Sequence, residues 1–301
     1  MSSSVLVVGS LAYDDVRTPV ASRDSVLGGA ASYFAMAASL YAPVRLVGVI
    51  GDDFREEDIA RLAARGIDLS GLERRAGRSF HWRGTYDFRL DTAETINTDL
   101  GVFADWRPTI PAAFADSGLV FLANIHPEIQ LATLDQMRAP RLVALDTMNY
   151  WIEQTRDALI RVIRRVEIIS INEPEARQLM GTLNIVRAAR EILTLGPRAV
   201  IIKRGEHGAT LFTPGGAFSS PAWPLEEVTD PTGAGDTFAG GLLGYLSQQT
   251  ELDDAALRRG VVHGNVCASF AVERFSVDGI EAATPADIER RYVAMRELMR
   301  I

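Results

Sequence analysis

Cysteine is almost absent from this sequence, since Cys267 is the only one among 301 residues. A single cysteine cannot form an internal disulfide, and such sparse use is typical of a reducing compartment. Histidine is also scarce, and its four positions match no metal-binding spacing: His81, His126, His207 and His263. These absences exclude a disulfide scaffold and a zinc site built from cysteine and histidine.

An excess of basic charge is missing as well. The chain has 31 lysine and arginine residues against 39 aspartate and glutamate residues, for a formal net charge of -8. Nucleic-acid binding relies on clustered basic residues, so we expect no nucleic-acid partner. The apolar run in the opening segment, MSSSVLVVGS, is too short for a membrane span and follows no basic residue. We therefore expect a cytoplasmic protein with no membrane partner.

The sequence does contain a regular alternation of two patterns. Short runs of branched apolar residues predict buried strands at 5–8, 44–50, 119–123, 142–145, 167–171 and 199–203. Longer segments between them predict helices at 28–40, 54–65, 127–137, 152–164, 174–180 and 185–195. Strands joined by helical crossovers indicate an α/β fold, with a mainly parallel sheet covered on both faces.

Two stretches break this alternation. From Ser79 to Phe103 the chain reads SFHWRGTYDFRLDTAETINTDLGVF, with aromatic and polar residues interleaved, which is typical of half-exposed strands. The segment 13–26 is similarly polar and non-helical. We predict that residues 12–26 and 79–103 form a small β appendage. The core would then comprise residues 1–11, 27–78 and 104–301. The alternative interpretation is a pair of long surface loops.

The stretch DPTGAGDTF, Asp230 to Phe238, holds the clearest signal for chemistry. Its glycines leave nearly bare backbone at the start of a predicted helix, and a helix N-terminus attracts anions. The amides of Gly233, Ala234 and Gly235 could hold a phosphate while Asp236 accepts a proton from an alcohol. The alternative is a glycine-rich helix start that only packs against the sheet, which explains the later glycines but not GAGD.

Several motifs in this order resemble the ribokinase-like (PfkB) family of carbohydrate and nucleoside kinases. DPTGAGDTFAGG resembles the family's carboxy-terminal signature, and VLGGAASYFAMAASLYAPVRLVGVIGDD its amino-terminal glycine-pair motif. NEPE resembles the N-x-x-E motif and KRGEHG the K-x-G-x-x-G element. The resemblance spans nearly the whole chain. It implies a three-layer α/β/α fold with about nine strands and a small β-sheet lid over the sugar site.

The resemblance also assigns roles in phosphoryl transfer. Asp236 would be the catalytic base, and the amides of Gly233, Ala234 and Gly235 would form the anion hole. ATP and Mg2+ are the implied cofactors, with Glu175 reaching Mg2+ through water. The implied nucleotide-binding residues are Asn172, Glu175, Lys203, Gly205, Gly208 and Asn265.

Local structure offers an alternative for some of these residues. Asn172 and Pro174 fit a helix start, in which Asn172 is only a cap. Gly205 and Gly208 fit a hairpin turn between strands at 199–203 and 209–212. His263 and Cys267, on the helix of Asn265, are interpreted as buried side chains.

The acceptor side of the site departs from the family's pattern. The resemblance places Asp14, Gly28, Gly29 and Tyr33 at the acceptor, but Tyr33 stands where the family usually has asparagine, and Ala12 replaces a polar residue common in ribokinases. Tyr33 could stack on a sugar or base, or pack under the lid. Four further candidates for the pocket have the core or surface as their alternative: Trp82, Tyr86, Asn124 and His126.

These features predict an ATP-dependent kinase acting on a hydroxyl of a small sugar or sugar-like molecule. The alternatives are a nucleoside kinase of the same family and a catalytically silent sugar- or nucleotide-binding homologue. A dinucleotide oxidoreductase is disfavoured because VVGSLAYDD lacks G-x-G-x-x-G. Asp230 and Thr232 match positions that bind a monovalent cation such as K+ in some family members. An exposed lid edge could also pair with a second subunit to give a homodimer.

Overall fold

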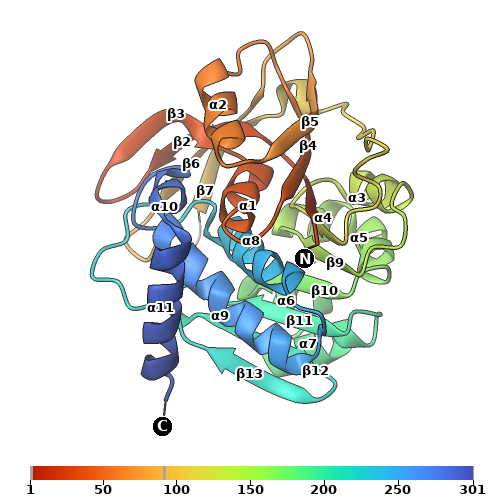
Figure 1. The fold of residues 1–301 in the computed structure, drawn as a ribbon, viewed down its shortest axis with the longest axis vertical. Helices are drawn as coiled ribbons and strands as arrows, with labels where there is room; N and C mark the ends of the chain where they lie inside the picture. The colour runs from red at the N-terminus through yellow and green to blue at the C-terminus, as the bar shows by residue number, and fades with distance from the viewer. Residues whose placement is uncertain (1–2, 91–92, 301) are drawn as a thin grey trace.

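The computed structural model describes residues 3–90 and 93–300 of the chain. Its centre is a nine-stranded sheet in the order β13-β12-β11-β10-β9-β8-β1-β4-β5 (Figure 1). All neighbouring strands from β11 to β5 run parallel, whereas β12 and β13 each pair antiparallel to the preceding strand. The strands are β1 (Val5–Val8), β4 (Val44–Ile50), β5 (Asp68–Arg74), β8 (Leu119–Leu122), β9 (Leu142–Asp146), β10 (Ile168–Asn172), β11 (Ala199–Lys203), β12 (Ala209–Thr213) and β13 (Gly216–Ser220).

Helices cover both faces of this sheet (Figure 1). One layer contains α1 (Ala30–Ala38), α2 (Glu56–Ala64), α8 (Ala234–Ser247), α9 (Asp254–Ala271), α10 (Asp278–Ala282) and α11 (Pro285–Leu298). The other contains α3 (Pro127–Leu134), α4 (Asn149–Gln154), α5 (Arg156–Ile163), α6 (Glu173–Met180) and α7 (Ile185–Leu193). Each face of the sheet packs against one helix layer to form a hydrophobic core. Strand β1 contributes to both cores, with Val5 and Val7 in one and Leu6 and Val8 in the other. The predicted three-layer α/β/α fold is confirmed.

A second, four-stranded sheet lies at one end of the large one, in the order β3-β2-β6-β7 (Figure 1). Its strands are β2 (Ala12–Arg17), β3 (Ser22–Gly28), β6 (Phe80–Tyr86) and β7 (Ala93–Asp99). The β2–β3 and β6–β7 pairs are antiparallel, while β2 and β6 run parallel. The small β sheet predicted from the two polar stretches is therefore present, and the alternative of two surface loops is wrong.

Some predicted boundaries differ from the structure. Helix α1 begins at Ala30, so the prediction of a helix from residue 28 is wrong: Gly28 ends β3, and Gly29 has a φ of 88°. The predicted helix at 152–164 is instead two helices, α4 and α5, separated at Thr155, whose φ and ψ of -137° and 35° are non-helical.

The sequence pattern does not predict strand β5. This strand lies at the edge of the large sheet and is partly exposed, so it lacks the continuous apolar run of the buried strands.

None of the helices within residues 3–90 and 93–300 is both long and apolar enough to cross a membrane.

Candidate functional site

Three neighbouring parallel strands end at the same edge of the large sheet and each contributes a polar residue there. Asp146 ends β9, Asn172 ends β10 and Lys203 ends β11, and Asn172 and Lys203 are register partners. The Lys203 Nζ lies 2.7 Å from Asp146 Oδ2, with little of either side chain exposed. The carboxyl ends of parallel strands are where open α/β sheets bind ligands. The edge therefore presents a buried ion pair at the expected position of a site.

Asp146 is not among the site residues predicted from the sequence. A signal was available, because a carboxylate that directly follows the buried run LVAL must lie at the carboxyl end of a strand. No motif named in the sequence analysis includes this residue, so it could be found only by following the strand to its end.

The GAGD stretch forms the start of helix α8. Gly233 is the N-cap with a left-handed φ of 73°, and Asp236 lies in the first helical turn. A methyl group added at Gly235 would lie 2.9 Å from the Lys203 Nζ. The ammonium therefore lies directly against the helix N-terminus, and the two positive features adjoin the same space. Such an arrangement favours an anion.

Carboxylates surround Lys203. Burial, reinforced by the charge of Asp146 and opposed by Lys203, raises the pKa of both Asp236 and Glu175 to about 7. Burial acts to lower the pKa of Lys203, but Asp146, Glu175 and Asp236 together raise it. Three carboxyl groups thus share one ammonium, which leaves an excess of negative charge when all are ionised.

This donor set fits Mg2+ held together with a phosphate ligand. Within the residues that the structure describes, no group of three or more histidine, cysteine or acidic side chains could enclose a metal ion by itself. Mg2+ is usually bound through one or two carboxylates, retained waters and substrate phosphates. Glu175 and Asp146 can supply those carboxylates, and the added positive charge would offset the excess of negative charge around Lys203.

The NEPE segment forms a reciprocal cap at the start of α6. Asn172 Oδ1 accepts from the Glu175 backbone amide at 2.8 Å, and the Asn172 backbone amide donates to Glu175 Oε2 at 3.0 Å. The capping interpretation of Asn172 is thus confirmed as local geometry. It is compatible with a second role, because the cap fixes the buried Glu175 carboxylate close enough to Asp146 and Lys203 for their charges to shift its pKa.

The predicted hairpin also holds for the K-x-G-x-x-G element. Lys203 pairs with Ala209 across the antiparallel strands β11 and β12. Gly205 and Gly208 have left-handed φ values of 53° and 82°, and a methyl group at Gly208 would lie 2.1 Å from the Ser220 carbonyl oxygen. The backbone geometry of the turn therefore accounts for both glycines.

Asn265 reaches the same region from helix α9. Its Nδ2 donates to Ser220 Oγ and to the Pro221 carbonyl, each at 3.0 Å. Asn265 and the Gly208 turn thus meet at residues 220–221, as two sides of one surface.

Asp14 and the glycine pair meet on the side of the small sheet. Asp14 is 4% exposed, and a methyl group at Gly28 would lie 1.9 Å from its Oδ2. Only glycine allows the carboxylate to lie this close to strand β3. Burial raises the pKa of Asp14 to about 8, with further contributions from the charges of Asp230 and Asp236, while a hydrogen bond from the Gly29 backbone opposes the rise.

Tyr33 occupies the space between Asp14 and the start of α8. It is 1% exposed, and a methyl group at Gly233 would lie 2.3 Å from its ring. Its hydroxyl is buried and has no hydrogen-bond partner among the residues described. Burial first, and then the charges of Asp14 and Asp230, raise its pKa. The two alternatives for Tyr33 are stacking on a sugar or base and packing under the lid. The ring is packed, while the hydroxyl has no hydrogen-bond partner among the described residues.

The small sheet also contacts the GAGD loop. Thr232 Oγ1 donates to the Tyr86 hydroxyl at 3.2 Å, and the Thr232 amide donates to Asp230 Oδ1 at 2.9 Å. The other Asp230 oxygen accepts from the Ser276 amide at 3.4 Å. Tyr86, Thr232 and Asp230 therefore form a connected chain beside the site.

Several remaining candidates have local structural roles. Trp82 Nε1 donates to Thr95 within the small sheet at 3.2 Å, and Asn124 Oδ1 accepts from Trp151 at 3.0 Å. His126 caps helix α3 by accepting from the Glu128 amide at 3.1 Å.

The buried interpretation of His263 and Cys267 is confirmed. The His263 ring stacks between Tyr245 and Tyr292 at 4.3 and 4.1 Å, and burial lowers its pKa to about 4. Cys267 is fully buried on the same helix, and burial raises its pKa to about 12.

Comparison with known proteins identifies the family of this chain. Residues 3–282 match the family described as pfkB family carbohydrate kinase. A cytidine kinase from Thermococcus kodakarensis is 33% identical over 257 residues, which cover 83% of this chain and 91% of the relative.

Solved structures share the fold. A fructokinase double mutant from Vibrio cholerae O395, solved with fructose, ADP and a potassium ion, has a TM-score of 0.80 at 20% identity and covers 96% of this chain and 99% of its own. A protein from E. coli solved with ATP and Mg2+ has a TM-score of 0.77 at 20% identity, covering 97% of this chain and 99% of its own.

Proposed function

This chain belongs to the pfkB family of carbohydrate kinases, and we propose that it transfers the γ-phosphoryl group of ATP to a hydroxyl of a small sugar-like molecule. The observation that carries the proposal is the Lys203 ammonium, 2.9 Å from the position of a methyl group on Gly235. It brings a cation, a helix N-terminus and the carboxyl of Asp236 to one place. Phosphoryl transfer depends mainly on such positioning and charge stabilisation.

In this proposal Asp236 accepts the proton of the acceptor hydroxyl. A pKa near 7 suits a general base at neutral pH, because the group is ionised for much of the time yet still binds a proton well. The amides of Gly233, Ala234 and Gly235, together with Lys203, would stabilise negative charge on the group in transfer. Asp146 would hold the Lys203 ammonium in place through the 2.7 Å ion pair.

The nucleotide would lie along the ends of β10 and β11. When bound, ATP supplies the phosphoryl group and Mg2+ neutralises phosphate charge. Asn172, Glu175 and Lys203 would face the phosphates, with Glu175 reaching Mg2+ through water. The surface shared by Gly205, Gly208 and Asn265 would take the remainder of the nucleotide.

The acceptor would lie between the small sheet and α8, bordered by Asp14, Gly28, Gly29 and Tyr33. The Asp14 carboxyl can accept hydrogen bonds from a sugar's hydroxyl groups. We propose that residues 12–26 and 79–103 act as the lid over this site, with residues 1–11, 27–78 and 104–301 as the core.

A nucleoside is the second candidate for the acceptor. The cytidine kinase relative is 33% identical over most of both chains. Moreover, Tyr86 is only half-buried and is close enough to Asp14 for their charges to interact, so its ring could contact a base. A nucleoside carries ribose hydroxyls, so Asp14 would have the same role for both acceptor classes.

Two features would modulate this activity. Asp230 and Thr232 would border a site for K+. Burial of the Asp230 carboxylate raises its pKa, and a bound cation would stabilise the ionised form. The edge strand β7 of the small sheet, where Ile96 is 55% exposed, would pair with a second copy of the chain.

The test is ADP release from Mg-ATP in the presence of single acceptors. The panel would contain ribose, fructose, cytidine and adenosine, with and without K+. We expect rapid release with a sugar or a nucleoside, and the faster class identifies the acceptor. Tight binding of a panel member with no release of ADP would instead support a catalytically silent binding protein.

A further inference from the structure

Two consecutive residues of strand β2 point to opposite faces of the small sheet, as neighbours on a strand must. Asp14 lies against Gly28 on the face of the proposed acceptor site. Tyr13 packs on the other face, where its ring stacks on Phe54 with centroids 5.1 Å apart and the Arg55 guanidinium lies 4.6 Å from its centre. Any shift of Tyr13 along this face therefore moves the backbone that carries Asp14.

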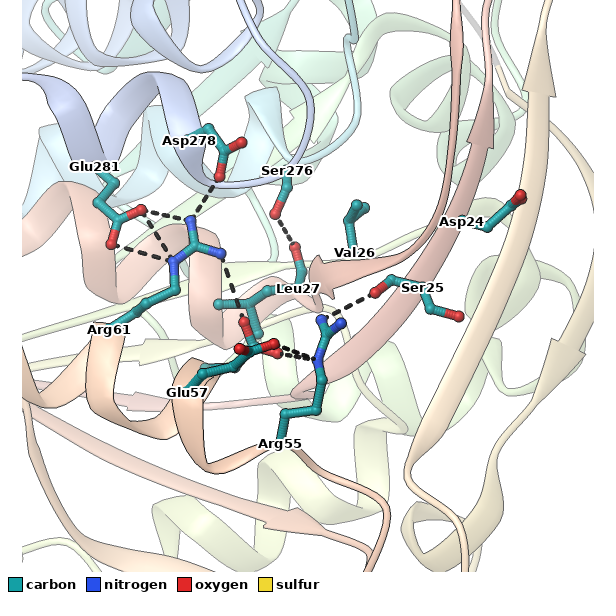
Figure 2. Close-up of a pocket in the computed structure, with 11 residues that line it drawn as sticks. Asp24, Ser25, Val26, Leu27, Arg55, Glu57, Arg61, Ser276, Asp278 and Glu281 are labelled. Carbon is teal, nitrogen blue, oxygen red and sulfur yellow. Dashed lines mark hydrogen bonds and ion pairs between the residues drawn. The ribbon is translucent and has the colours of Figure 1, made fainter.

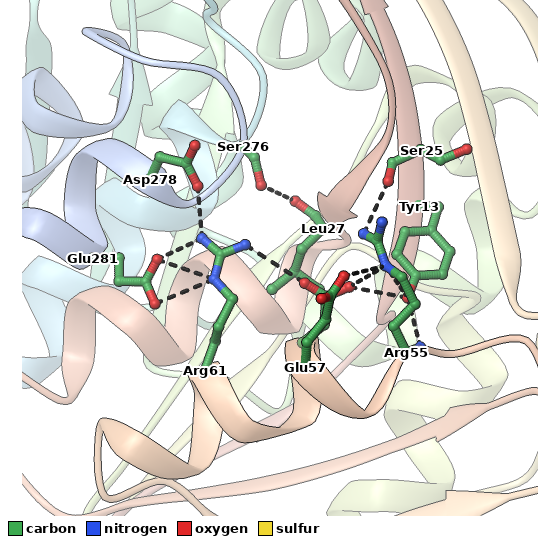
Figure 3. A network of polar contacts seen from close by, with 10 residues as sticks. Tyr13, Ser25, Leu27, Arg55, Glu57, Arg61, Ser276, Asp278 and Glu281 are labelled. Atoms are coloured by element: carbon green, nitrogen blue, oxygen red, sulfur yellow. Dashed lines mark hydrogen bonds and ion pairs between the residues drawn. The ribbon is translucent and has the colours of Figure 1, made fainter.

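The tyrosine is anchored at its hydroxyl by a buried carboxylate. Asp58, from helix α2, is 2% exposed and accepts from the Tyr13 hydroxyl at 3.0 Å. The same carboxylate accepts from Arg55 Nε at 2.8 Å and lies 3.5 Å from Arg61 Nη1. Figure 3 shows the Arg55 guanidinium beside the Tyr13 ring, and Arg61 turned toward Asp278 and Glu281. Asp58 is thus the shared partner of one tyrosine and two arginines.

A second connection runs from Arg55 to strand β3. Arg55 Nη2 donates to the Ser25 carbonyl at 3.0 Å, and the Ser25 amide donates to Asp15 at 2.7 Å. Ser25 has a left-handed φ of 51°, which costs energy for a residue with a side chain and persists only where contacts impose it. It lies three residues before Gly28, so this connection sets the path of β3 toward the acceptor site.

Open space borders this segment of β3. A cavity of about 430 Å3 is lined by Asp24, Ser25, Val26 and Leu27 on one side and by Arg55 and Arg61 on the other (Figure 2). Asp24 and Ser25 are exposed and Val26 is half-buried, whereas Leu27 packs in the core, so the segment before Leu27 lacks close side-chain packing on this side. Its position there depends on polar contacts, from Arg55 at Ser25 and from the Ser276 hydroxyl at the Leu27 carbonyl.

We propose that Asp58 is a positioning residue for acceptor binding. Through the Tyr13 hydroxyl it fixes β2, and through Arg55 it fixes β3. Together these two contacts set the separation between the Asp14 carboxylate and Gly28. The inference rests on the proposed function, in which Asp14 binds the acceptor.

The proposal predicts an effect confined to one substrate. Lys203, Glu175 and Gly235 lie on β11, α6 and α8, and no hydrogen bond or ion pair among the described residues joins any of them to Asp58 or Tyr13. Loss of the Tyr13–Asp58 hydrogen bond should therefore raise the KM for the acceptor and leave the KM for ATP unchanged. A purely structural role would lower the melting temperature and change neither KM selectively.

The test uses the full-length chain and the panel member that gives the fastest ADP release. Tyr13→Phe removes one hydroxyl and keeps the packed ring, and Asp58→Asn keeps the shape of the side chain. Each should raise the acceptor KM by about threefold to tenfold, the worth of one hydrogen bond, with the KM for ATP within about twofold of wild type. The matched control is Glu57→Gln, because Glu57 is exposed and also lies 3.4 Å from Arg55 but does not contact Tyr13. It should leave both constants unchanged.

Two further measurements complete the test. The effects of Tyr13→Phe and Asp58→Asn should be less than additive in the double variant, since both changes act on the Tyr13–Asp58 contact. Asp14→Ala distinguishes failure of the proposed acceptor site from failure of the positioning role of Asp58. If it leaves the acceptor KM unchanged, the proposed acceptor site is wrong. If Asp14→Ala raises that KM while Tyr13→Phe does not, or if Tyr13→Phe changes both KM values equally, only the positioning role of Asp58 is overturned. Tyr13→Phe carries the test even if Asp58→Asn fails to fold.

Discussion

The Tyr33 ring lies so close to Gly233 that a methyl group on the glycine would come within 2.3 to 2.4 Å of three ring carbons. Gly233 caps helix α8, where the anion hole is proposed, and Tyr33 comes from helix α1 on the acceptor side. One side chain therefore separates the two halves of the proposed site. Its buried hydroxyl lies near Asp14, Asp230 and Asp236, whose charges all raise its pKa.

Tyr33→Phe should make the protein more stable and its acceptor binding weaker. The change keeps the ring on Gly233 and removes a buried hydroxyl that has no partner among the described residues, a group that typically costs about 1–3 kcal/mol when unsatisfied. If the acceptor satisfies that hydroxyl, its KM should rise while the melting temperature also rises. Thermal unfolding and steady-state kinetics measure the two effects. A rise in melting temperature with an unchanged acceptor KM would mean that Tyr33 only packs.

Asp236→Asn should lower kcat by roughly 100- to 10,000-fold while nucleotide binding is retained, because a positioned general base typically contributes a rate enhancement of about that size. The amide cannot accept the proton but keeps the size of the side chain. Turnover and ATP affinity should be measured on the same preparation. The control is Asp135→Asn, which removes an exposed ion pair with Arg165 and should change neither. Turnover of Asp236→Asn within a few-fold of wild type would show that the carboxylate is not the base.

The pH dependence of kcat/KM should report the raised pKa of Asp236. The base must be deprotonated to act, so activity should fall about tenfold per pH unit as the pH drops below about 7. An aspartate with its ordinary pKa of about 3.9 would stay active to much lower pH. A pH–rate profile between pH 5 and 9 distinguishes these cases. Constant kcat/KM down to pH 5 would contradict the raised pKa.

Substitution at Gly235 should lower the rate of phosphoryl transfer, and a larger side chain should lower it further. In Gly235→Ala the new methyl group would lie 2.9 Å from the Lys203 Nζ, too close for the ammonium to stay, and Gly235→Val adds further bulk at the helix start. We expect a larger loss of kcat for valine than for alanine, with only modest falls in melting temperature. Wild-type turnover by the valine variant would rule out the anion hole at this position.

The buried carboxyl of Asp14 should make stability depend on pH. Its folded-state pKa of about 8 exceeds the unfolded value, so it contributes stability that is fully present below about pH 4 and is lost as the pH rises through about 8. Asp14→Asn has no charge to bury, so its melting temperature should fall less than that of wild type between pH 5 and pH 8. The comparison by thermal unfolding removes effects shared by both proteins. Equal slopes for the two proteins would show that Asp14 is not a source of this dependence.

The sequence alone determined the fold class and the position of the proposed catalytic loop. Branched apolar runs such as 5–8 can be buried only in a sheet covered on both faces, and they were found at their predicted places. GAGD was identified because bare backbone at a helix start has few other uses. These are local signals, carried by residues that are adjacent in the chain.

Only the tertiary structure decided which distant residues meet. Asp146 and Lys203 are 57 positions apart, and Tyr33 and Gly233 lie on separate helices. Nothing in either local sequence specifies a partner, because the contacts follow from the order of strands in the sheet and from the packing of α1 against α8. The raised pKa values of Asp14, Glu175 and Asp236 have the same origin. Burial and neighbouring charge produce them, and both exist only when the chain is folded.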